Sequence, residues 1–143
     1  MVTYMVGDYK VCIEEATAFL HIAQSCVGDA GEFLLGQMYP FAVNCSLSCE
    51  LYIKAIMIHN SQNGEFKKGH NLNDLFESMD AVDQNAITSI YAHKCTKPLS
   101  ELLTESGDAF IDWRYALEKG VTICVSGILA LAESLAEYTS HFK

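Results

Sequence analysis

Residues 41 to 59 constrain the fold more than any other stretch, because they are apolar on nearly every side of a helix. In the sequence FAVNCSLSCELYIKAIMIH the charged residues are Glu50 and Lys54, apart from the terminal histidine. These two are four positions apart with the acid on the N-terminal side, so their side chains can pair along one helical face. A helix that is hydrophobic all round must be covered by other elements. The sequence therefore predicts a central helix that carries one ion pair among apolar neighbours.

A first helix is expected between about Tyr9 and Cys26, where apolar residues recur every three or four positions. We expect this spacing to form one buried stripe that contains Cys12, Ala16, Phe19, Ile22, Ala23 and Cys26. The turn-forming sequence GDAG ends the pattern. Residues 32 to 38 could add a helical turn or two before Pro40.

Four further helices are expected in the second half of the chain. Asn71 and Asp74 have the spacing of a capping box, which predicts a short helix with apolar Leu72, Leu75, Phe76 and Met79. Asp80 or Asp83 can cap the next helix, which runs to about Cys95. A helix that restarts at Pro98 extends to Trp113, with a kink at Gly107. The last helix covers residues 121 to 138, where Ser126 and Gly127 permit a close neighbour.

The chain has 143 residues, half of them hydrophobic, which suffices for one core. No repeat or linker divides it, and no β-strand pattern competes with the helical ones. The predicted organisation is a single all-α domain over residues 1 to 143, an up-and-down bundle of about five to six helices.

The formal net charge of −9 repels phosphate backbones and anionic lipids at long range. Non-specific nucleic-acid binding is therefore not expected. The longest charge-free stretches, residues 33 to 49 and 120 to 132, are interrupted by Pro40 and Asn44 or too short for a membrane span, which needs about 20 apolar residues. The start of the chain has no basic signal-peptide region, and six cysteines in a chain with its own core favour free thiols. We expect a soluble cytoplasmic protein.

Cysteine and histidine are the residues that could suggest a metal site. Cys45 and Cys49 share a helical face, and His59, His70 or His93 could complete a zinc site with them. On so apolar a helix, core cysteines without metal are the more common arrangement. The chain also has no nucleophile signature and no glycine-rich phosphate loop. The sequence therefore predicts no catalytic residue, no metal and no cofactor.

Three elements of the chain form a recognisable combination: the Glu50 to Lys54 face in NCSLSCELYIKAIM, the Gly-His-x-Leu start in GHNLNDLFESM, and the aromatic-Arg-Tyr element in FIDWRYALEK. Together, over roughly residues 41 to 135, they resemble the HEPN family of helical domains. The resemblance implies a helical bundle that forms homodimers and belongs to prokaryotic defence, toxin–antitoxin, stress or nucleotide-handling systems. Many members are metal-independent ribonucleases.

The ribonuclease signature of that family is an arginine followed, after four to six residues, by a histidine. Arg114 would require a histidine at position 119, 120 or 121, where this chain has Lys119, Gly120 and Val121. The chain therefore resembles the branch that is considered to bind nucleotides or partner proteins. Two alternatives stay open: a ribonuclease in which His70, His93 or Lys119 substitutes for the histidine, and an all-α interaction or structural domain with no small-molecule ligand.

The residues with which such a module would bind its ligand are Glu50, Lys54, His70, Arg114, Tyr115 and Glu118. Arg114 is the only arginine of the chain, and its planar guanidinium suits a carboxylate or a phosphate better than a lysine does. A surface or interhelical ion pair of Arg114, for example with Glu118, is the simpler interpretation. We expect Glu50 to be its likeliest protein partner, with Lys54 and His70 nearby. Such a cluster is either a pocket or a buried network that fixes helix register.

Overall fold

The computed structural model of the chain describes residues 4–34, 36–108 and 124–142. Several sequence-based predictions lie outside these residues. They concern Arg114, Tyr115, Glu118 and Lys119, the end of the helix expected to reach Trp113, and the start of the last helix.

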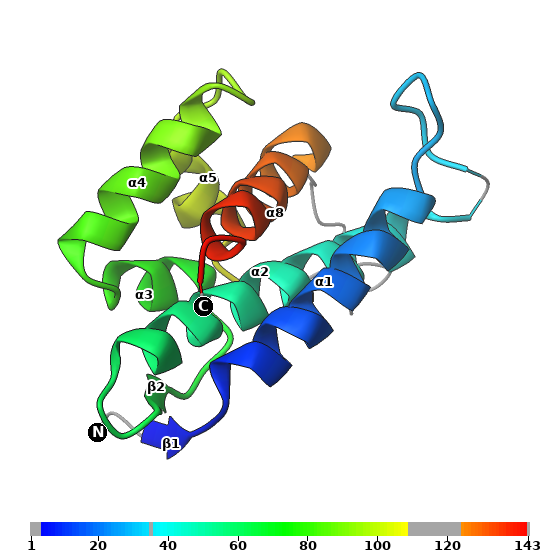
Figure 1. Cartoon of the computed structure of the whole chain (residues 1–143). Helices are drawn as coiled ribbons and strands as arrows, with labels where there is room; N and C mark the ends of the chain where they lie inside the picture. Colours follow the sequence, from blue (N-terminus) through cyan, green and yellow to red (C-terminus); the bar gives the residue numbers. More distant parts are fainter. Residues whose placement is uncertain (1–3, 35, 109–123, 143) are drawn as a thin grey trace.

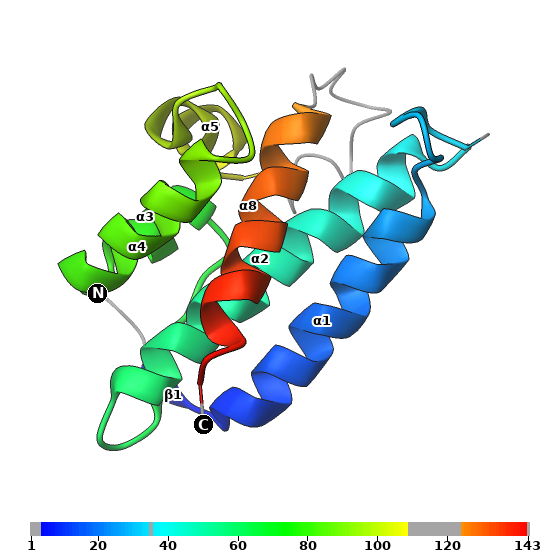
Figure 2. The same cartoon turned by 45° about the horizontal axis from the view of Figure 1, so that its top comes forward.

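Two long helices, α1 (Tyr9–Ser25) and α2 (Met38–Asn60), lie side by side (Figures 1 and 2). The first helix is confirmed nearly to the residue, with Asp8 as its N-cap. The predicted stripe on α1 is partly wrong, because Ile22 is 47% exposed and Leu20 is buried in its place. The helix α2 begins before Pro40, which a first turn tolerates because its N–H groups have no intrahelical acceptor.

The central position predicted for α2 is confirmed. It contacts α1, α3 (Leu72–Glu77), α8 (Val125–Thr139) and the strand β2 (Glu65–Lys67), and most of its residues are buried. By length and composition alone this helix could cross a membrane, although it contains both Glu50 and Lys54. In the fold 72% of its most apolar window is buried, as in the core helix of a folded domain.

Four shorter helices complete the described bundle (Figures 1 and 2). They are α3 (Leu72–Glu77), α4 (Ala81–Ala92), α5 (Leu99–Ser106) and α8 (Val125–Thr139). The helices α3 and α8 pack against α2, α8 also contacts α1, and α4 and α5 pack against α8. The capping prediction for Asn71 is confirmed, since its side chain accepts from the Asp74 N–H at 2.9 Å. Asp80 is the N-cap of α4, although its side chain makes no capping hydrogen bond.

Two short strands were not predicted. The strand β1 (Tyr4–Val6) pairs antiparallel with β2, placing Tyr4 opposite Lys67 and Val6 opposite Glu65. Three residues are too few for an alternating pattern to emerge from the sequence, and the pairing partners are about 60 positions apart. The described structure is otherwise helical, so the all-α class holds.

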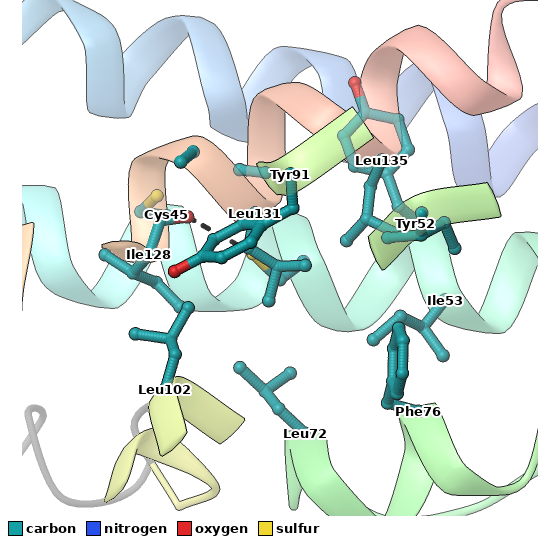
Figure 3. Close-up of a cluster of buried hydrophobic side chains, with 14 of the residues drawn as sticks. Cys45, Tyr52, Ile53, Leu72, Phe76, Tyr91, Leu102, Ile128, Leu131 and Leu135 are labelled. Atoms are coloured by element: carbon teal, nitrogen blue, oxygen red, sulfur yellow. Dashed lines mark hydrogen bonds between the residues drawn. The ribbon is translucent and has the colours of Figure 1, made fainter. Parts of the chain in front are cut away.

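The core lies where α2, α3, α4, α5 and α8 meet (Figure 3), and it continues between α2 and α1 with Ala16, Leu20 and Ala23. Its largest fully buried side chains include Tyr52, Ile53, Leu72, Tyr91, Leu102, Ile128, Leu131 and Leu135. The predicted close approach at Gly127 is confirmed, because a Cβ there would come within 2.7 Å of Leu102 Cδ1. All six cysteines are free thiols.

Candidate functional site

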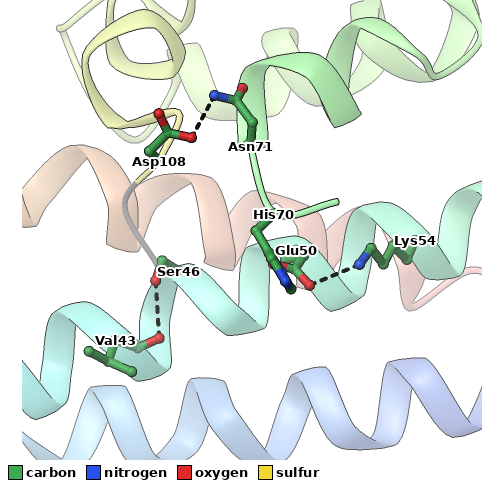
Figure 4. Close-up of polar contacts among 7 residues, drawn as sticks. All are labelled: Val43, Ser46, Glu50, Lys54, His70, Asn71 and Asp108. Atoms are coloured by element: carbon green, nitrogen blue, oxygen red, sulfur yellow. Dashed lines mark hydrogen bonds and ion pairs between the residues drawn. The ribbon is translucent and has the colours of Figure 1, made fainter. Parts of the chain in front are cut away.

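Glu50 is the centre of a polar cluster on α2. Its side chain is only 4% exposed, and each carboxylate oxygen has its own partner (Figure 4). Lys54 Nζ donates to Oε2 at 2.9 Å, and His70 Nδ1 lies 2.9 Å from Oε1. The predicted Glu50–Lys54 pair and the contact between His70 and Glu50 are therefore confirmed.

His70 connects this buried carboxylate to the surface, because half of its side chain is exposed. A carboxylate only accepts hydrogen bonds, so Nδ1 is the donor in this contact. The preceding residue, Gly69, has a φ of +139°, where a residue with a side chain would be strained. This backbone conformation turns the chain into the position from which His70 reaches α2.

Lys54 receives support from an element that sequence analysis missed. Its side chain is 11% exposed, and its ammonium lies 5.7 Å from the centre of the Phe66 ring on β2. A cation near an aromatic face is attracted by the ring's quadrupole, so Phe66 stabilises the ammonium as it leaves water. The strand pairing that positions Phe66 thus contributes to the cluster.

Asn71, the residue after His70, connects this part of the chain to the end of α5. Its amide Nδ2 donates to Asp108 Oδ1 at 2.9 Å, and the Leu72 N–H donates to the Gly107 carbonyl at 2.7 Å (Figure 4). A Cβ at Gly107 would come within 2.9 Å of the Asn71 amide. These contacts hold the segment that contains His70 and Asn71 against Gly107 and Asp108.

The ligand-binding roles predicted for Arg114, Tyr115 and Glu118 lie outside the described residues. The pairing of Arg114 with Glu50 stays a prediction. In the structure, Lys54 and His70 already supply one partner to each oxygen of the buried Glu50 carboxylate. Glu50 therefore does not require the arginine for its own compensation.

The Glu50–Lys54–His70 cluster, named from here by these three residues, has a defined chemical capacity. An unpaired buried charge costs several kcal/mol, and the two contacts of Glu50 offset that cost. His70, oriented by the carboxylate, presents an imidazole at the surface that can donate to or accept from a ligand. Lys54 adds a nearby ammonium. This combination suits an anionic or hydrogen-bonding ligand.

A second buried carboxylate, Asp83, was predicted only as a possible helix cap. Instead it accepts from Asn60 Nδ2 at 2.7 Å and from the Tyr138 hydroxyl. It therefore joins α2, α4 and α8. Its partners lie 23 and 55 positions away, so no local spacing in the sequence could indicate them.

The structure also locates the residues considered for a metal site. Cys45 and Cys49 are fully buried in the core, while His59 and His93 are exposed. Within the described residues, no three histidine, cysteine, aspartate or glutamate side chains lie close enough to hold a metal ion.

No protein-family model, no curated protein and no solved structure matches this chain.

Proposed function

We propose that this protein is a non-catalytic, HEPN-like helical module that binds a nucleotide or a partner protein through the Glu50–Lys54–His70 cluster. The observation that carries the proposal is the buried Glu50 carboxylate, which holds a buried lysine and a half-exposed histidine. The helical architecture is compatible with the family resemblance, which itself rests on sequence.

Of the two ligand classes, the geometry favours a nucleotide. The accessible part of the cluster is the half-exposed imidazole of His70. With Nδ1 donating to Glu50, the protonated imidazole has its second N–H to donate to a phosphate oxygen, and the charge of the buried Lys54 ammonium lies close behind it. A single nucleotide carries few charges, so the net charge of −9 opposes it less than it opposes a polynucleotide. In the biological setting that the resemblance implies, such a module works in a prokaryotic defence, toxin–antitoxin or stress system.

Thermal unfolding in the presence of ATP, ADP, AMP or GTP tests the proposal, because a ligand that binds only the folded state raises its apparent stability. We expect at least one of these nucleotides to raise the Tm of the wild type and to lose this effect in His70→Gln. His93→Gln is the matched control, since His93 is also exposed but lies at the end of α4.

Two outcomes would contradict nucleotide binding at this cluster. One is an unchanged Tm with all four nucleotides, which would leave a partner protein as the remaining ligand class. The other is a nucleotide effect that survives in His70→Gln, which would place the binding site elsewhere.

Purified protein should leave RNA intact with or without divalent metal, because the histidine of the ribonuclease signature is missing. Cleavage that disappears in Arg114→Ala would instead establish the ribonuclease alternative. Gel analysis of a labelled single-stranded RNA measures this directly, with the Arg114→Ala protein as the matched control.

The resemblance also leads us to propose a homodimer. Light scattering at tens of micromolar protein should give the mass of two chains, and a monomer at that concentration would contradict the proposal.

A further inference from the structure

A cavity of about 590 Å³ lies between α3, α4 and α5, apart from the Glu50–Lys54–His70 cluster. Its volume is in the range of small-molecule sites in proteins. Apolar side chains form much of its wall, including Phe76 from α3, Ala92 from α4, and Leu99 and Leu103 from α5. The cavity can therefore accept a ligand with a mainly apolar body.

Cys95 lies in the wall of this cavity, just after α4, with its side chain only partly buried. Groups that can stabilise a thiolate surround it. The Tyr91 hydroxyl is the largest influence that lowers the pKa of the Cys95 thiol, against the opposing effect of burial. The backbone and ammonium of Lys97 and the Ser126 hydroxyl also lower this pKa.

Tyr91 contributes to the wall of this cavity and has a buried hydroxyl near Cys95. Tyr91 as a whole is 1% exposed. Its hydroxyl has no hydrogen-bond partner within the part of the chain that the structure describes. Figure 3 shows the hydroxyl turned toward Ile128 and Leu102. It is near enough to Cys95 to affect the thiol's pKa, yet no contact of ordinary hydrogen-bond geometry joins them. A negative charge on sulfur would give this donor an acceptor.

Three other thiols, those of Cys12, Cys26 and Cys45, have surroundings that disfavour the thiolate. Burial, followed by the charges of Glu15 and Asp8, raises the pKa of Cys12. Burial also raises the pKa of Cys26, and more strongly that of Cys45 beside Cys49. Because the thiolate is the reactive form, Cys95 combines access with the chemistry that a nucleophilic thiol requires.

We propose that the cavity between α3, α4 and α5 is a covalent modification site, in which Cys95 captures a small α,β-unsaturated carbonyl compound with an apolar body. The thiol releases its proton to water, and the thiolate sulfur attacks the β-carbon to form a C–S bond. The C=C electron pair moves toward the carbonyl as an enolate, and water returns a proton to the α-carbon. The product is a thioether, and the reaction requires no oxidant or reductant.

The test compares two reagents with the same reactive group, N-phenylacrylamide and acrylamide, on the full chain. Peptide mass spectrometry gives the modification rate at each cysteine, with the part-buried Cys12 as the internal control. We expect Cys95 to react first with both reagents. Its preference over Cys12 should be about tenfold larger for N-phenylacrylamide, because the cavity buries part of the phenyl ring. Equal preference for the two reagents, or faster reaction at Cys12, would overturn the proposal.

A pH profile tests the environment of the thiol independently of the ring. Among the described residues, the titratable groups around Cys95 include Tyr91 of α4, Lys97, Cys124 before α8, and Glu77 of α3 across the cavity. Lys97 is paired with Glu105 of α5 and is also near Glu101. In Tyr91→Phe the reaction at Cys95 should shift to higher pH, while that at Cys12 stays unchanged. Lys97→Gln should shift the pH profile of Cys95 in the same direction, and it replaces Tyr91→Phe in this test if that variant does not fold. An unmoved Cys95 profile in a folded variant would contradict the proposed site.

Discussion

Two carboxylates, Glu50 and Asp83, are buried in this protein, and different kinds of partner compensate their lost hydration. As whole residues, Glu50 is 3% exposed and Asp83 is 6% exposed, so both carboxylates have lost most of their hydration. Glu50 lies in the middle of α2 and pairs with an ammonium and an imidazole. Asp83 lies in the first turn of α4 and accepts from an amide and a phenol, which are neutral.

This difference indicates different roles for the two sites. The partners of Asp83 come from α2 and α8, near the C-terminal end of each helix, so the carboxylate ties three helices together. Tyr138 also packs against Phe142, which stacks on His59 at a centroid distance of 4.1 Å. Glu50 instead holds a half-exposed histidine at the surface. Asp83 therefore has the features of a structural contact, whereas Glu50 is the centre of the proposed binding site.

The largest effect is expected from Glu50→Leu, which leaves Lys54 buried without its anionic partner. Chemical denaturation should show a loss of about 3–5 kcal/mol in the free energy of unfolding. The double variant Glu50→Leu with Lys54→Met removes both charges and should recover most of that loss. A double variant as unstable as the single one would mean that the charges themselves are not the cause.

A smaller effect is expected from Asp83→Ala, because the groups left without an acceptor are neutral. The free energy of unfolding should fall by about 1–3 kcal/mol. Asn60→Ala is a matched comparison that removes one of the two donors while keeping Tyr138 in place. If Asp83→Ala destabilises the protein more than Glu50→Leu does, the distinction between charged and neutral partners fails.

A third effect, confined to alkaline pH, concerns the stability that Tyr138 contributes. Burial, and then the neighbouring Asp83 carboxylate, raise the pKa of Tyr138 from its ordinary value of 10 to about 12. The folded state therefore holds this proton more tightly, so the contribution is complete below pH 10 and is lost as pH rises from 10 to 12. The Tm of Tyr138→Phe should fall less steeply than that of the wild type across this window. Parallel slopes would show that Tyr138 is not linked to the alkaline loss.

Gly69 offers a way to sharpen the comparison at the proposed binding site. Gly69→Ala should strain the backbone at its φ of +139° and displace His70 from Glu50, with a loss of about 1 kcal/mol in the free energy of unfolding. Gly36→Ala is a control at a positive-φ glycine far from this cluster in sequence. The nucleotide response should weaken in Gly69→Ala and persist in Gly36→Ala. A preserved response in both variants would show that the conformation at Gly69 does not position His70 for binding.

Local regularities in the sequence determined most of the helices and half of the candidate site. The apolar run of α2, the capping pair at Asn71 and the four-residue spacing of Glu50 and Lys54 concern residues near one another in the chain. Helical periodicity and capping are local interactions, so the residue types alone indicate them. For His70 the sequence indicated only a place near Glu50, and the hydrogen bond between them joins residues 20 positions apart.

Tertiary structure decided the contacts between residues far apart in the chain. The pairing of β1 with β2 places Phe66 by Lys54, and the partners of Asp83 come from two other helices. The exposure of Ile22 likewise depends on which face of α1 the neighbouring helices cover. Periodicity gives the spacing of an apolar face, but burial and long-range hydrogen bonds depend on which elements meet, and that is set by packing of the whole chain.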